Sequence, residues 1–72
     1  MKKEELKRFF SEFWEIDSSK VTENLKIDDS SIKNSNSLRF YQFISAVESN
    51  FNVKFKDIHN ILTFRDLIKN IQ

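Results

Sequence analysis

The sequence predicts an all-α fold, a small four-helix bundle with three main helices, one short helix and a long loop between the first two helices. Apolar residues recur at helical spacing in three separate stretches. Glycine and proline are both absent, which argues against tight hairpins and glycine-rich phosphate loops. The 72 residues suffice for one domain, residues 1–72, with a core drawn mainly from eight Phe, one Trp and one Tyr.

The first helix is expected over residues 2–16. Its apolar residues fall at the spacing that places them on one helix face, and they are Leu6, Phe9, Phe10 and Phe13, with Trp14 beside them. Charged side chains occupy most of the other positions. Asp17, Ser18 and Ser19 favour local side-chain hydrogen bonds over continued helix, so the helix should end before them.

Residues 17–36 are predicted to form one long loop, because Asp, Asn, Ser, Thr and Lys dominate this stretch. Isolated apolar residues at Val21, Leu25, Ile27 and Ile32 are expected to pin it across the bundle. A loop of this length in a compact domain usually has a function. The alternative is a disordered linker, but such linkers normally lack regularly placed apolar residues.

The second helix is expected over residues 37–52, with Asn36 or Ser37 as its N-cap because either side chain can accept a hydrogen bond from the first turn. Its apolar face consists of Phe40, Phe43, Ile44, Val47 and Phe51. Asn50 and Asn52 are weak helix formers and mark its end.

The segment from Val53 to Asn60 is ambiguous. Residues 53–55 alternate like a strand but have no evident partner strand, so a single helical turn near residues 57–61 is favoured. The last helix should start at Thr63, which has capping-box spacing to Asp66. Its buried stripe is predicted to be Phe64, Leu67, Ile68 and Ile71.

Composition argues against several functions. Twelve basic and eleven acidic residues give a net charge of +1, and they are interspersed, so nucleic acid is not an expected partner. No segment has the length and apolar character of a signal peptide or a membrane span, and we expect a cytoplasmic protein. Without cysteine, and with His59 as its only histidine, the chain offers no thiolate zinc site and no convincing catalytic constellation, so we expect neither a metal site nor an enzyme.

One stretch carries a family pattern. Asn36-Ser37-Leu38 is followed by Phe40, Phe43-Ile44, Ala46-Val47-Glu48 and Phe51-Asn52-Val53, and then by Asp57-Ile58 and the run from Ile61 to Ile68. This pattern resembles the acyl carrier protein signature, in which Asp-Ser-Leu opens the second helix and a threonine-capped turn precedes the last one. With residues 6–24 similar to the first helix and the start of its long loop, the resemblance covers nearly the whole chain and implies a bundle of acyl carrier type.

The resemblance implies a specific site and a specific function. Ser37 would be the attachment point of a covalent 4′-phosphopantetheine arm, with Asn36 beside it. The arm would carry an acyl or aminoacyl group as a thioester. The chain would be a discrete, monomeric carrier of a specialised biosynthetic pathway, such as fatty acid or polyketide synthesis. Its partners would be a phosphopantetheinyl transferase and acyl-transferring or acyl-activating enzymes, and the chain itself would catalyse nothing. The helix N-terminus around Ser37 would suit a phosphodiester electrostatically.

The sequence departs from the family at the predicted partner surface. Asn36 stands where the family has an Asp that helps to hold magnesium during loading, and an amide oxygen is a weaker ligand for this cation. Arg39 and Gln42 stand where acidic residues are expected, and of the usual acids only Glu48 is present. Leu38 and Tyr41 are candidate apolar anchors for a partner. A dedicated set of partners is the inference.

A second hypothesis stays open from the sequence alone. The chain could be a carrier-like protein–protein interaction module that is not phosphopantetheinylated, as Asn36 and the loss of helix acids suggest. Ser37 would then be only a helix cap, and Ser37→Ala would cost about 1 kcal/mol of stability without loss of activity. The residues do not identify the cargo.

Overall fold

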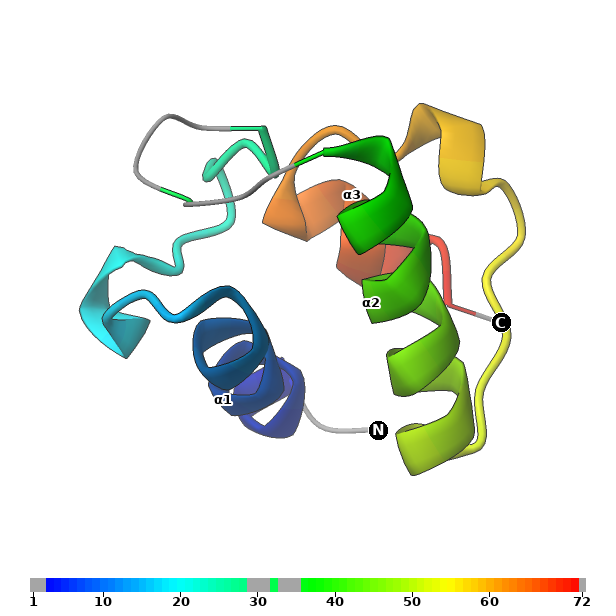
Figure 1. The fold of residues 1–72 in the computed structure, drawn as a ribbon, viewed down its shortest axis with the longest axis horizontal. Helices are drawn as coiled ribbons and strands as arrows, with labels where there is room; N and C mark the ends of the chain where they lie inside the picture. Colours follow the sequence, from blue (N-terminus) through cyan, green and yellow to red (C-terminus); the bar gives the residue numbers. More distant parts are fainter. Residues whose placement is uncertain (1–2, 29–31, 33–35, 72) are drawn as a thin grey trace.

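The computed structural model describes residues 3–28, 32 and 36–71 (Figure 1). In these residues it contains three α-helices, α1 (Lys3–Trp14), α2 (Ser37–Phe51) and α3 (Phe64–Lys69). Short 3-10 turns lie at Ser18–Lys20 and Ile58–Asn60. The predicted all-α class is confirmed, and the expected short helix is a 3-10 turn. Figure 1 shows residues 15–28, the described first part of the connection from α1 to α2, along the left side of the molecule.

The core is aromatic and centres on Phe43 of α2, whose side chain is fully buried. Its ring lies 5.1 to 5.8 Å, centroid to centroid, from four rings of α1, those of Phe9, Phe10, Phe13 and Trp14. Phe10 also meets Phe64 of α3 edge to face at 5.4 Å. The three helices therefore share one apolar core. The indole N–H of Trp14 is buried there without a hydrogen-bond partner among the described residues.

Both long helices end in left-handed residues. Glu15 follows α1 with φ 56°, and the N–H of Ile16 donates to the Ser11 carbonyl at 3.0 Å. This closure ends α1 two residues before the predicted boundary at residue 16. Asn52 follows α2 in the same conformation, as expected for the residue that marks its end. The Asp17 carboxylate accepts a hydrogen bond from the Ser19 N–H, which is the predicted local side-chain bond that competes with continuation of the helix.

The long loop is pinned as predicted where the structure describes it. Val21, Ile27 and Ile32 are buried, and Leu25 is half-buried against the core. Residues 29–31 and 33–35 of the predicted loop, like residue 2 of the predicted first helix, lie outside the described residues. The apolar side chains of the loop therefore close one end of the core.

The loop also pairs with the segment that leads into α3. Ile27 N–H donates to the Leu62 carbonyl at 3.0 Å, Phe64 N–H to the Leu25 carbonyl at 2.9 Å, and Arg65 N–H to the Glu23 carbonyl at 3.0 Å. An isolated antiparallel bridge joins Lys26 to Thr63. The bonds from Phe64 and Arg65 satisfy N–H groups in the first turn of α3 that the helix itself leaves unpaired.

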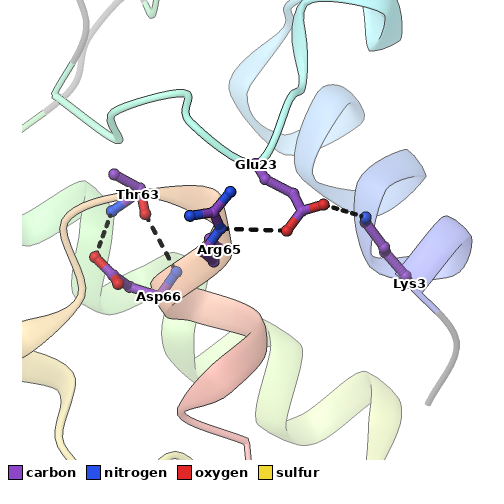
Figure 2. Close-up of polar contacts among 5 residues, drawn as sticks. All are labelled: Lys3, Glu23, Thr63, Arg65 and Asp66. Atoms are coloured by element: carbon purple, nitrogen blue, oxygen red, sulfur yellow. Dashed lines mark hydrogen bonds and ion pairs between the residues drawn. The ribbon is translucent and has the colours of Figure 1, made fainter.

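The N-terminus of α3 is a capping box, as predicted (Figure 2). The Thr63 hydroxyl accepts from the Asp66 N–H at 3.2 Å, and the Asp66 carboxylate accepts from the N–H groups of Leu62 and Thr63, each at 3.1 Å. The backbone hydrogen bonds from Leu62 and Thr63 lower the pKa of Asp66 below its ordinary value. This carboxylate therefore stabilises the fold at neutral pH, and its contribution is lost as pH falls through the lowered pKa.

The last helix is shorter than the predicted stripe. It ends at Lys69, so Ile71 lies beyond it and forms an isolated antiparallel bridge with Phe55. The Lys56 N–H donates to the Asn70 carbonyl at 2.9 Å beside this bridge. The strand-like alternation of residues 53–55 thus reflects one bridge to the C-terminal segment, a partner that the sequence did not reveal.

Candidate functional site

Ser37 is the first residue of α2, and Asn36 is the N-cap. The backbone of Asn36 is extended, and its side-chain oxygen accepts a hydrogen bond from the Arg39 N–H at 2.9 Å. The prediction left the cap between Asn36 and Ser37, and the structure assigns it to Asn36. Ser37 is exposed, and its hydroxyl has no hydrogen-bond partner within the described part of the chain.

This geometry corrects one expectation for Ser37. If Ser37 were only a helix cap, its replacement would remove a capping bond and destabilise α2. Because Asn36 supplies that bond, Ser37→Ala is expected to cost less than the roughly 1 kcal/mol that loss of an N-cap residue typically costs. Within the described residues, the capping bond of α2 therefore comes from Asn36 and not from the Ser37 hydroxyl.

A pocket of about 270 Å³ lies beside Ser37. Its lining comes from three parts of the chain, namely the long loop, the start of α2 and the segment before α3, and consists of Ile27, Asp28, Asn36, Ser37, Phe40, Ile61 and Leu62. Ile27 and Ile61 are buried and Phe40 is half-buried, so the walls are apolar, while the polar groups sit at the start of α2 and at Asp28. The hydrogen bond from Ile27 to Leu62 joins two of its walls.

Three large apolar side chains are exposed in the described residues, and one of them lines this pocket. Leu38 is 69% exposed and Tyr41 45% exposed, as predicted for candidate partner anchors. Leu62, 68% exposed, belongs to the pocket lining itself and was not predicted. Leu62 lies in a connecting segment, so no helical period in the sequence indicates that its side chain is exposed. Its position next to Thr63, the capping-box residue, does indicate that it lies at the start of α3.

The two charged residues of α2 are engaged within the fold. The Arg39 guanidinium lies 4.4 Å from the centroid of the Phe13 ring and donates to the Phe13 carbonyl at 3.2 Å. The Glu48 carboxylate accepts a hydrogen bond from the Phe55 N–H at 3.2 Å. Of the predicted partner residues, Leu38, Tyr41 and Gln42 are exposed, whereas Arg39 and Glu48 are half-buried and contribute to packing. The exposed residues that follow Ser37 in the first turns of α2, namely Leu38, Tyr41 and Gln42, therefore carry no charge.

No protein-family model matches the chain, and a search of curated proteins found no match. Among the described helices, none combines the length and the apolar character that crossing a bilayer requires. Within the same residues, no three Asp, Glu, Cys or His side chains gather to hold a metal ion.

Proposed function

We propose that the protein is a discrete acyl carrier that holds an acyl or aminoacyl group as a thioester on a phosphopantetheine arm attached to Ser37. The observation that carries the proposal is the exposed hydroxyl of Ser37, which has no hydrogen-bond partner among the described residues and lies at the start of a 15-residue helix beside an apolar pocket. Enzymes that load and use the arm would perform the chemistry. A cytoplasmic location and a monomeric state belong to this proposal.

The helical arrangement supports the proposal. A long pinned loop precedes α2, and a short 3-10 turn at Ile58–Asn60 separates α2 from α3. In the four-helix carrier interpretation, this turn takes the place of the short third helix. The apolar side chains of Phe43, Phe10 and Phe64 fill the centre of the bundle. The first residues of α2 lie outside this core and are exposed, so they are available for the attachment site.

The residues around Ser37 fit a phosphodiester-linked arm. The first N–H groups of an α-helix have no partners within the helix and form its positive end, which favours a phosphate group. Asn36 supplies the capping bond of α2 and so leaves the Ser37 hydroxyl exposed for attachment, while Asp28 adds one carboxylate to the lining of the same pocket. The apolar walls contributed by Ile27, Phe40 and Ile61 offer contacts to the aliphatic part of the arm.

Intact-mass measurement tests this proposal. The purified chain is incubated with coenzyme A, magnesium and a broad-specificity phosphopantetheinyl transferase, and the expected result is a gain of one phosphopantetheine that fragmentation places on Ser37. If no transferase adds the arm, the loading claim fails and the alternative of an unmodified carrier-like interaction module is favoured. A pull-down in which the unmodified chain binds its partner as well as the loaded chain would support that alternative.

Asn36→Asp is expected to speed the loading of Ser37 by roughly tenfold or more when a general transferase is used. A carboxylate is a better magnesium ligand than an amide oxygen, and changes of this kind near a metal typically alter its binding by about 10–100-fold. Asp is as good an N-cap as Asn, so the helix should be unchanged. The measurement is the initial loading rate at several magnesium concentrations. The control is Asn52→Asp, a change of the same chemistry at the far end of α2, and an equal effect of both changes would contradict the prediction.

A further inference from the structure

The segment of residues 22–28, named here the strap, forms one wall of the pocket beside Ser37. Ile27 and Asp28 of the strap line the pocket opposite residues of α2 and of the segment before α3. Val21, which precedes the strap, and Ile27 within it are buried in the core. The pocket therefore keeps its shape only while the strap stays against residues 61–65.

Three backbone hydrogen bonds, at alternate residues of the strap, hold it there. They run from Ile27 to Leu62, from Phe64 to Leu25 and from Arg65 to Glu23, between 2.9 and 3.0 Å. The helix that receives the strap, α3, has only six residues. A helix this short is not stable alone, so the strap and the first turn of α3 stabilise each other.

Glu23 ties this contact to the rest of the molecule (Figure 2). One carboxylate oxygen lies 2.8 Å from the Lys3 ammonium nitrogen at the start of α1, and the other lies 3.3 Å from Nε of Arg65 in α3. The single side chain therefore bridges both helices, while its own carbonyl accepts from the Arg65 backbone. The hydrogen bond from Lys3, and then that from Arg65, lower the pKa of Glu23 below its ordinary value, so the bridge is charged at neutral pH.

We propose that Glu23 is a positioning residue that latches the strap and thereby controls the closure of the pocket beside Ser37. When the two ion pairs break, the backbone hydrogen bonds between the strap and residues 61–65 open more often, and in these openings the wall formed by Ile27 leaves the pocket, while the packing of Phe43 against α1 persists. Glu23 holds this pocket closed whether or not Ser37 is modified. Only the importance of the latch for an attached arm rests on the proposed function.

Amide hydrogen exchange of the full chain, followed residue by residue by NMR, tests the latch. In Glu23→Gln the amides of Ile27, Phe64 and Arg65 should exchange roughly two- to tenfold faster, because exposed ion pairs are individually weak. The amide of Val47, in the buried centre of α2, should be unchanged. The control is Glu12→Gln, which removes an exposed glutamate of α1 that has no ion pair among the described residues.

Salt provides a second readout that an effect of side-chain shape or packing alone would not move, because screening acts on the charge of Glu23. Raising the salt to 1 M shortens the Debye length to about 3 Å and weakens exposed ion pairs. The three amides of the wild-type chain should therefore exchange faster in 1 M NaCl, and this response should be lost in Glu23→Gln. Unchanged exchange at these amides, equal acceleration at Val47, or an equal salt response in both proteins would overturn the latch. None of these results depends on loading, which the intact-mass measurement decides separately.

Discussion

Ser37→Ala is expected to abolish phosphopantetheine loading completely and to leave the free energy of unfolding within about 0.5 kcal/mol of the wild-type value. The arm needs the seryl oxygen as its point of attachment, and alanine has none. Stability should be kept because Asn36 supplies the N-cap bond to the Arg39 N–H and Ser37 is exposed. Intact mass reports the loading, and urea unfolding reports the stability.

The control for this change is Ser45→Ala, which removes another exposed serine from the same helix. The Ser45 variant should load like the wild type. Loading that persists in Ser37→Ala would place the arm on another residue and contradict the assignment. A loss of stability above about 1 kcal/mol in Ser37→Ala would instead show that its hydroxyl acts as a cap after all.

Phe43→Ala is expected to destabilise the fold by about 3–5 kcal/mol, because it removes a fully buried ring that meets four rings of α1. A domain of 72 residues has a total stability of roughly 4–11 kcal/mol. The change should therefore lower Tm by roughly 15–30 °C or prevent folding altogether. Fluorescence of Trp14, the single tryptophan of the chain, reports unfolding directly from the core.

Tyr41→Ala is the matched control, since Tyr41 lies on the same helix and is 45% exposed. It should cost less than about 1 kcal/mol. If the two changes cost the same, Phe43 would not be the centre of the core, and the packing of α1 against α2 would be contradicted.

The sequence predicted the helices because periodic apolar spacing is a local signal, and it predicted the capping box at Thr63 for the same reason. It missed the end of α1 because Glu15 is not a residue type that normally adopts the left-handed conformation. It also missed the pairing of the strap with the segment before α3. Hydrogen bonds between two loop backbones leave no pattern in the side chains, so neither Leu62 nor the pocket wall at Ile27 could be inferred.

The candidate site was predictable in part. Asn36, Ser37 and Leu38 stood out through capping chemistry and the family resemblance, and their roles in loading and partner contact stay predictions. The inward orientation of Arg39 had an available signal, because Arg39 lies four and eight residues before Phe43 and Val47, both of which are fully buried. Residues at that spacing share a helix face. Arg39 was predicted to contact a partner because its neighbours in the sequence are exposed. Its position on the helix instead places its side chain next to the core, over the Phe13 ring.

The placement of Arg39 over Phe13 has a consequence for how fast partners would find the proposed carrier. Arg39 packs on α1 and is balanced on the same helix by Glu48, so α2 carries no net side-chain charge to attract a partner over a distance. Association without electrostatic attraction typically proceeds at on the order of 10⁵–10⁶ M⁻¹ s⁻¹, well below the rates of oppositely charged pairs. Encounters at Ser37 would then be governed by diffusion and by the local concentration of the partner enzyme, and recognition would be decided after contact by the shape of the surface around Leu38, Tyr41 and Leu62.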